Sequence, residues 1–311
     1  MKTIFVLAAG LLISSTSALA NDYPTRNIEI IVPFSAGGGN DVFVRALQPV
    51  LERELDTNLV VRNVPGGGGA VGLTQASRLP ATGYNLVAVS DGTLTQVASG
   101  NVAFGVDDFT FIAKVLQEPY LLAVSQDSEY QTLEDMQAAI AEGTTVRVGV
   151  SGVGSSAHLT ALAIADALET EFSTIPFDGG SETISAVMGG HIDAVVLGGA
   201  ELRSSMSSGR VKALATSYPE RSDALPDVPT FQEQGVDFTT SVFRGIAAPS
   251  GIPEEVNDRL VEAIEQAVQD EQFLRSAGNL GTDVETAYGE ELEAFIQDLA
   301  ERMQQQADRL N

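Results

Sequence analysis

The chain has 311 residues, and its 42 Asp and Glu residues against 17 Lys and Arg residues give a formal net charge of −25. This acidity argues against nucleic acid and anionic membrane surfaces as partners, because both are bound through basic patches. The absence of Cys excludes disulfides, thiolate metal sites and cysteine nucleophiles.

The first twenty residues have the pattern of a secretory signal peptide. Lys2 gives a basic start, Ile4 to Ile13 form an apolar run, and Ala18-Leu19-Ala20 has the A-x-A form of a signal-peptidase site. The apolar run is shorter than the roughly 20 residues needed to cross a bilayer. We therefore expect residues 1–20 to be removed and the protein to act in the periplasm, with a retained anchor as the alternative.

The remaining length suggests two domains, and the first opens with strands and helices in alternation. Apolar runs and helically spaced apolar residues predict, in order, strand 27–32, helix 41–55, strand 58–61, helix 74–78 and strand 85–89. Such a βαβαβ unit implies a parallel sheet with right-handed crossovers. Pro49 inside the first helix should kink or split it.

A second unit of the same kind follows. Its predicted elements are extended segment 120–125, helix 133–141, strand 145–150, helix 155–168, strand 172–177, helix 181–188, and strands 192–197 and 211–216. Extended segment 241–249 then leads to helices 253–277 and 290–309, which have no strands of their own. We expect a two-lobed α/β protein with a mostly parallel sheet in each lobe: lobe 1 is 21–116 plus 243–311, and lobe 2 is 117–242.

Six loops lie at the carboxyl ends of the predicted strands, where open parallel sheets bind ligands. They are Phe34 to Asp41, Pro65 to Gly69, Ser90 to Thr93, Ser151 to Ser156, Asp178 to Ser181, and Leu197 to Ala200. Most carry several glycines, which let backbone N–H groups at a helix start approach and bind an anion. The loops, including Ser90 and Asp91, therefore predict a site for a small carboxylate; the alternative is that the glycines only form tight turns.

No cofactor or metal is expected. Gly152-x-Gly154 lacks the full Rossmann spacing, and none of the six loops contains a Lys for a phosphate. Two His and no Cys argue against a transition-metal site. Ser155, Ser156 and His158 leave a secreted α/β hydrolase as the alternative function, although the G-x-S-x-G elbow is missing. A helix that begins at Ser155 should keep the His158 ring neutral, and we expect this ring to line the cleft or brace the loop.

Several segments of the chain resemble the Bug/TctC solute receptors of tripartite tricarboxylate transporters. The similar segments are Tyr23-Pro24-Thr25-Arg26, Ile30 to Asp41, Asn63 to Gly69, Gly83-Tyr84, Gly154-Ser155-Ser156-Ala157-His158-Leu159, Ala224 to Thr230, and Ala248 to Pro253. They extend over the whole chain after the signal peptide. The resemblance implies a Venus-flytrap fold, with no enzymatic activity, that holds a carboxylate between its lobes and delivers it to a membrane permease of such a transporter. We expect a monomer.

The resemblance also implies which residues touch the ligand, chiefly those of the first loop of each lobe. In lobe 1 these are Phe34, Ser35, Ala36, Gly37, Asn40 and Asp41, and in lobe 2 they are Ser155, Ser156 and His158, with Asp178, Gly179, Gly180 and Ser181 beside them. Val64 stands where the family has Arg, and Asp178 where many members have Lys. These departures favour a mono- or dicarboxylate, including an amino acid whose ammonium group faces Asp41 or Asp178.

Overall fold

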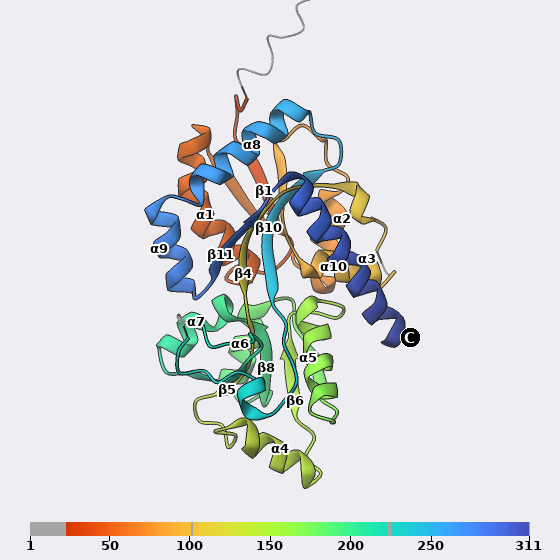
Figure 1. The fold of residues 1–311 in the computed structure, drawn as a ribbon, viewed down its shortest axis with the longest axis vertical. Helices are drawn as coiled ribbons and strands as arrows, with labels where there is room; N and C mark the ends of the chain where they lie inside the picture. The colour runs from red at the N-terminus through yellow and green to blue at the C-terminus, as the bar shows by residue number, and fades with distance from the viewer. Residues whose placement is uncertain (1–22, 101, 223–224, 311) are drawn as a thin grey trace, which may run out of the picture.

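The structure is a computed structural model that describes residues 23–100, 102–222 and 225–310. The predicted signal peptide, residues 1–20, lies outside the described residues. Two β-sheets with flanking helices form two lobes stacked along the long axis of the molecule (Figure 1). The two-lobed α/β architecture predicted from the sequence is confirmed.

The upper lobe in Figure 1 is built on a six-stranded sheet with the order β11-β4-β10-β3-β1-β2. The strands are β1 (Ile28–Val32), β2 (Leu59–Asn63), β3 (Asn85–Ser90), β4 (Phe109–Glu118), β10 (Val242–Pro249) and β11 (Asp283–Ala287). Strand β1 pairs parallel with β2 and β3, whereas β10 pairs antiparallel with β3 and β4. The sheet is therefore mixed. Strand β4 leads out of this lobe, and β10 returns to it in the opposite direction.

The lower lobe is built on a five-stranded sheet with the order β7-β6-β8-β5-β9. Its strands are β5 (Tyr120–Ser125), β6 (Arg147–Val150), β7 (Ser173–Pro176), β8 (Ala194–Gly198) and β9 (Val211–Thr216). Strand β6 pairs parallel with β7 and β8, and β5 pairs antiparallel with β8 and β9. The chain changes sheet at Pro119, between β4 and β5, and again between β9 and β10.

Both sheets are covered on two faces, and the strand sequences show why. Successive side chains of a strand point to opposite faces, so Ile30 and Ile31 of β1 enter two different hydrophobic clusters. Leu121 and Leu122 of β5 divide in the same way. All four side chains are buried, which is why these strands read as continuous apolar runs instead of alternating ones.

The helices follow the strands of their own lobe except at the C-terminus. The upper lobe has α1 (Gly39–Leu55), α2 (Ala70–Ala76), α3 (Asp91–Ala98), α8 (Glu254–Ala267), α9 (Glu271–Leu280) and α10 (Gly289–Leu310), and the lower lobe has α4 (Leu133–Ala141), α5 (Ser156–Ala167), α6 (Gly180–Met188) and α7 (Gly199–Ser207). Helices α8 and α9 pack on α1, and α10 packs on α3 and β4. The C-terminal helices therefore return to the upper lobe.

Three details of the C-terminal region and of α1 differ from the sequence predictions. Strand β11 was not expected, because it is an edge strand whose residues Asp283, Val284 and Glu285 are exposed and show no apolar pattern. The single helix expected over 253–277 is two helices, since the Asp270 carboxylate caps α9 by accepting from the Gln272 amide at 2.7 Å. Helix α1 runs unbroken through Pro49, so the expected split is absent.

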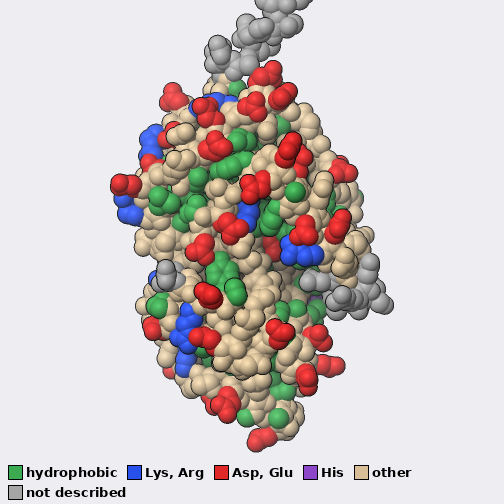
Figure 2. Space-filling model, viewed as in Figure 1, with side chains coloured by type: hydrophobic (Ala, Val, Ile, Leu, Met, Phe, Trp, Pro, Cys, Tyr) green, Lys and Arg blue, Asp and Glu red, His purple; other side chains and the backbone are tan. Residues whose placement is uncertain are grey.

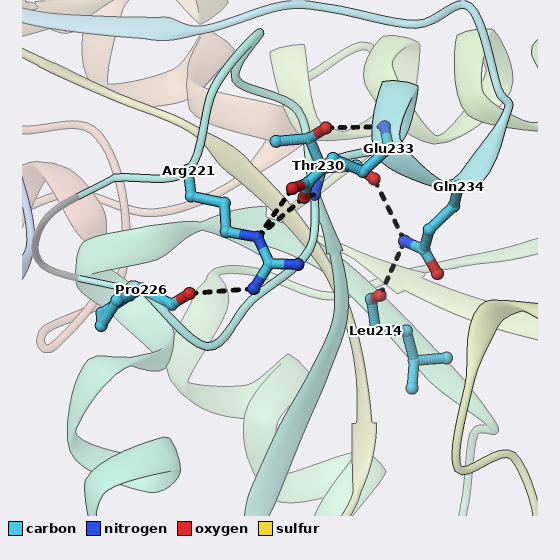
Figure 3. A network of polar contacts seen from close by, with 6 residues as sticks. All are labelled: Leu214, Arg221, Pro226, Thr230, Glu233 and Gln234. Carbon is cyan, nitrogen blue, oxygen red and sulfur yellow. Dashed lines mark hydrogen bonds and ion pairs between the residues drawn. The ribbon is translucent and has the colours of Figure 1, made fainter.

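The long connection from β9 to β10 is held by polar contacts within the lower lobe (Figure 3). The Arg221 guanidinium donates to the Glu233 carboxylate at 2.8 Å and to the Pro226 carbonyl at 3.0 Å. The Gln234 amide donates to the Leu214 carbonyl of β9 at 3.1 Å. These contacts fix the connection that carries the chain back to β10.

None of the helices in the described part of the chain is long and apolar enough to cross a membrane.

Candidate functional site

The loops of the two lobes meet and enclose a small cavity. Its volume is about 20 Å³, which is room for about one water molecule. The lining residues come from both lobes: Phe34, Gly38, Gly39, Asn40, Ser90 and Arg244 from the upper lobe, and Tyr120, Ser151, Ser156, Ala157, Gly180 and Glu201 from the lower lobe. Five of the residues predicted from the sequence are thus brought together: Phe34, Asn40, Ser90, Ser156 and Gly180.

Around the cavity, the glycine-rich loops of opposite lobes lie in direct contact. A Cβ atom on Gly152 would lie 2.5 Å from Gly68 Cα, and one on Gly179 would lie 3.0 Å from Ser35 Cβ. Any side chain at Gly152 would therefore push the lobes apart. The predicted residues Ser35, Ala36, Gly37, Asp178, Gly179 and Ser181 lie in this contact zone: Ser181 Oγ donates to the Ala36 carbonyl at 2.6 Å, and Ser35 Oγ donates to the Asp178 carbonyl at 3.3 Å.

Gln96 of α3 joins the two lobes through one amide group. Its Nε2 lies 3.0 Å from the Gly67 carbonyl and 3.1 Å from the Gly68 carbonyl of its own lobe. The same atom lies 3.2 Å from the Gly154 carbonyl of the lower lobe. Because Gln96 is only 3% exposed, this bridge is shielded from water.

Two helices from opposite lobes begin at the cavity without a side-chain cap from the preceding residue. Helix α1 begins at Gly39 after Gly38, and α6 begins at Gly180 after Gly179; neither preceding glycine offers a side-chain cap. The N–H groups at such helix starts, together with the helix dipole, favour an anion. Helix α5 differs, because Ser155 caps it by accepting from the His158 amide at 3.1 Å.

A buried ion cluster around Arg244 of β10 forms one wall of the cavity. The guanidinium contacts Glu118 Oε1 at 2.6 Å and Glu201 Oε1 at 3.6 Å, and it donates to Asn40 Oδ1 at 3.2 Å. Burial alone would lower the pKa of Arg244, but the carboxylates of Glu118 and Glu201 outweigh it and raise the pKa. Arg244 therefore keeps its positive charge inside the protein.

The Glu201 carboxylate comes from α7 of the lower lobe and reaches the start of α1 in the upper lobe. It accepts hydrogen bonds from the backbone amides of Gly39 and Gly198. Its side chain is 8% exposed, and burial raises its pKa to about 7 although Arg244 acts to lower it. A carboxylate of the protein thus occupies the anion position that α1, α6 and Arg244 create.

Asn40 and Asp41, which are adjacent in α1, have different surroundings. Asn40 is 1% exposed, and its Nδ2 has no hydrogen-bond partner among the described residues. Asp41 accepts from the Gly37 amide at 2.8 Å, from Arg45 at 2.8 Å and from Asn63 at 3.0 Å. Burial acts to raise the pKa of Asp41, but these donors outweigh it and the pKa is lowered. Asp41 therefore braces the first loop, whereas Asn40 keeps a donor free at the cavity.

Ser90 and Asp91 lie at the start of α3. Ser90 lines the cavity, whereas Asp91 accepts from the Phe243 amide at 3.0 Å. Burial raises the pKa of Asp91 to about 6, although the Phe243 amide acts to lower it. Asp91 lines a separate groove of about 850 Å³ next to the segments that connect the lobes.

The imidazole of His158 forms no hydrogen bond with Ser155 Oγ or Ser156 Oγ. Its Nδ1 accepts from the Gly154 amide at 3.1 Å, and Nε2 lies 3.3 Å from Thr174 Oγ1. Burial lowers its pKa, so the ring is neutral, with the proton on Nε2. Ser156 Oγ instead accepts from the Tyr120 hydroxyl at 2.6 Å. The ring therefore braces the loop, and no serine–histidine pair is formed.

Arg244, Glu201 and Tyr120 line the cavity, and Glu118 pairs with Arg244, although none of the four was predicted from the sequence. A signal was present for Arg244, since it interrupts the apolar run Val242-Phe243-Arg244-Gly245-Ile246, and a charge in a buried strand needs a partner. The distribution of charge on the surface does not mark the site, because acidic side chains are spread over both lobes (Figure 2).

The sequence matches the family described as "Tripartite tricarboxylate transporter family receptor" over residues 43–311. Protein BugT of Bordetella pertussis is 27% identical over 305 residues, which cover 96% of this chain and 93% of the relative. A protein of Agrobacterium vitis, described as "UPF0065 protein in the TAR-I ttuE-ttuC' intergenic region", is 28% identical and covers 90% of this chain and 82% of that protein.

Solved structures give the same result for the fold. The periplasmic binding protein BugD is 26% identical with a TM-score of 0.88, covering 92% of this chain and 98% of that chain. MatC from Rhodopseudomonas palustris, solved with bound malate, is 25% identical with a TM-score of 0.85. The match covers 92% of this chain and 100% of MatC. The chain therefore belongs to the tripartite tricarboxylate transporter receptor family, whose members are solute-binding receptors and not enzymes.

Proposed function

We propose that this protein captures a small organic carboxylate, a mono- or dicarboxylate or an amino acid, between its two lobes and delivers it to a membrane permease of a tripartite tricarboxylate transporter. One observation carries the proposal. The uncapped starts of α1 and α6, from opposite lobes, converge with Arg244 around a single carboxylate, that of Glu201. A site that holds one carboxylate in this way has the donors and the charge to hold a ligand carboxylate in its place.

The proposed ligand contacts are the residues that line the cavity, with the loops around it acting as the closing surfaces. Phe34, Asn40, Ser90, Ser156 and Gly180 are assigned to the ligand. Asn40 is the strongest of these, because its buried Nδ2 is an unused donor. Asp41 is the weakest partner for a ligand ammonium group, because its oxygens already accept three hydrogen bonds. Asp178 is exposed at the rim.

The moving parts are proposed to be lobe 1, residues 21–116 plus 243–311, and lobe 2, residues 117–242. The changes of sheet at Pro119 and between β9 and β10 support this division. Opening would separate Gly68 from Gly152 and Ser181 from Ala36, contacts that join the lobes. A ligand favours closure only by binding the closed form more tightly than the open one.

The location and partners of the protein follow from the same proposal. The family's structural relatives include periplasmic binding proteins, and the pattern of residues 1–20 supports export through a cleaved signal peptide. We propose a monomer that meets its permease outside the cytoplasm. The hydrolase alternative loses support, because the His158 ring binds Gly154 and Thr174 instead of a serine hydroxyl.

A melting-temperature screen of the purified protein tests the ligand class. The screen uses succinate, L-malate, L-glutamate and propionate, with glucose and choline as neutral and cationic controls. An acid at roughly 100 times its dissociation constant should add about 2.7 kcal/mol to the free energy of unfolding. Mass spectrometry of the acid after prolonged incubation should show it unchanged. Stabilisation by glucose or choline alone, or breakdown of the acid, would overturn the proposal.

A further inference from the structure

The position of the Glu201 carboxylate has a consequence for ligand binding. It lies so close to Gly180 that a Cβ atom on Gly180 would overlap Glu201 Oε2, and its Oε1 lies 2.9 Å from the Cβ position of Gly39. It therefore fills the space in front of the first residue of α1 and of α6. The Gly39 amide is one of the donors that a ligand carboxylate needs there, and Glu201 already uses it.

The charges around Arg244 also indicate that a ligand carboxylate cannot bind while Glu201 is in place. Arg244 is paired with Glu118, which is 0% exposed and also accepts from the Ala200 amide at 2.7 Å. Glu201 is thus a second carboxylate beside one buried guanidinium. A third, brought by a ligand, would leave one positive charge among three negative ones in a low-dielectric site, which is strongly unfavourable.

We propose that Glu201 is a built-in competitor, whose carboxylate occupies the ligand's anion position and holds the lobes together until an external carboxylate displaces it. This inference rests on the proposed function, since it assumes that the ligand is an acid. The unused Nδ2 of Asn40 at the same cavity is an independent sign that a further acceptor binds there. Displacement leaves the ligand with Arg244, the Gly39 amide and Asn40.

Removing the competitor should tighten binding. We expect Glu201→Gln, which keeps the size of the side chain but not its charge, to raise the affinity for succinate, L-malate or L-glutamate roughly tenfold or more, since the charge-assisted bonds of Glu201 need not be broken first. Glu201→Ala should act in the same direction. Glu171→Gln, which removes an exposed charge in the same lobe away from the cleft, should leave the affinity unchanged.

A second measurement does not require that the natural ligand be known. Glu201→Ala deletes a CH₂–COO⁻ group, so acetate should fill the gap and raise the melting temperature of this variant in a dose-dependent way. Acetate should stabilise wild type and Glu171→Ala less at the same concentration, because in both it must first displace Glu201. Methylammonium serves as the control of opposite charge.

The dissociation constants of the acids for wild type and for both Glu201 variants, measured by calorimetry, test the competitor role. Unchanged or weaker binding of the acids by both Glu201 variants would overturn the competitor role, while binding by wild type would leave the proposed function standing. If none of the acids binds wild type or either variant, and acetate does not stabilise Glu201→Ala, the proposed function fails together with the inference.

Discussion

At the scale of single residues, the protein keeps its charges in the cleft by pairing them instead of exposing them. Arg244 and Glu118 have side chains that are 7% and 0% exposed, and they lie 2.6 Å apart. A buried pair of this kind is weak evidence for stability as a whole, but the loss of one partner leaves an uncompensated buried charge. The cluster is therefore sensitive to single substitutions.

Arg244→Met should lower the free energy of unfolding by about 3–5 kcal/mol, because Glu118 would remain buried without a cation. Urea denaturation measures this loss. Arg275→Met is the matched control: Arg275 pairs with Glu271 on the surface of α9, with side chains 67% and 88% exposed, and its loss should cost about 1 kcal/mol or less. Equal losses in the two variants would contradict the importance of the buried pair.

His158 should give the stability a dependence on pH. Burial lowers the pKa of the ring below its usual 6.5, so the fold holds the neutral form. The ring's contribution is therefore complete above pH 6.5 and is lost as the pH falls through the lowered pKa. At pH 8 the unfolding free energy of the wild type should exceed that of His158→Ala by about 1 kcal/mol, the value of one hydrogen bond to Gly154.

The difference in unfolding free energy between these two proteins, measured from pH 8 to pH 5, isolates His158 from other titrating groups. Asp91 and Glu201 have raised pKa values of about 6 and about 7, and as raised acids they act with the opposite sign, since their contribution is lost as the pH rises. They are present in both proteins and largely cancel. A difference that stays constant across this range would contradict the assigned role of the neutral ring.

At the scale of elements, the starts of α1 and α6 are the working parts of the site. Each begins with a glycine whose φ is not positive, so alanine fits the local backbone. A Cβ atom on Gly39 would nevertheless overlap Arg244, and one on Gly180 would overlap Glu201. Glycine is required here by the approach of the opposite side chains and not by the backbone conformation.

Gly39→Ala and Gly180→Ala should therefore weaken carboxylate binding roughly tenfold or more, because overpacking of a tight site costs about 1–3 kcal/mol. Isothermal calorimetry with an acid that stabilises wild type measures this. Gly278→Ala in α9 is the control, since a Cβ atom there meets nothing within 4 Å. It should raise stability by up to about 1 kcal/mol and leave affinity unchanged. Unchanged affinity in both site variants would contradict the assignment of the site.

At the scale of the whole molecule, function depends on the balance between open and closed lobes. Among the described residues, the polar links between the lobes that are shielded from water include the Arg244–Glu201 pair and the Gln96 amide, which contacts carbonyls on both sides. Closure that rests on a few such contacts is easily shifted, since each hydrogen bond contributes about 0.5–1.5 kcal/mol net.

Gln96→Ala should shift the population toward open lobes, which increases the radius of gyration in small-angle X-ray scattering and weakens ligand binding. Gln234→Ala is the matched control, because the Gln234 amide contacts the carbonyls of Leu214 and Thr230 within one lobe (Figure 3). That variant should lose some stability but keep the wild-type radius and affinity. The same radius and affinity in both variants would show that Gln96 does not hold the lobes closed.

The sequence by itself determined the two-lobed α/β class, most of the strands and helices, and the glycine-rich helix starts. These features are local: an apolar run specifies a buried strand, and a strand followed by glycines and a helix specifies a loop with free amides. The family followed from the same segments and is confirmed. The role of Ser155 was not among these, because the sequence placed it at the ligand whereas its hydroxyl caps α5.

Only the tertiary structure decided what fills the cleft. Glu118 and Arg244 are 126 positions apart in the chain, and Glu201 reaches Gly39 from the other lobe. No periodicity links such residues: Glu118 and Arg244 meet because β4 and β10 pair in one sheet, whereas Glu201 meets Gly39 only when the lobes come together. The His158 ring likewise needs the fold of its own lobe to reach Thr174, which lies in a separate strand. Pairing of buried charge is a long-range property, so it is fixed by how strands and lobes pack and not by any one segment.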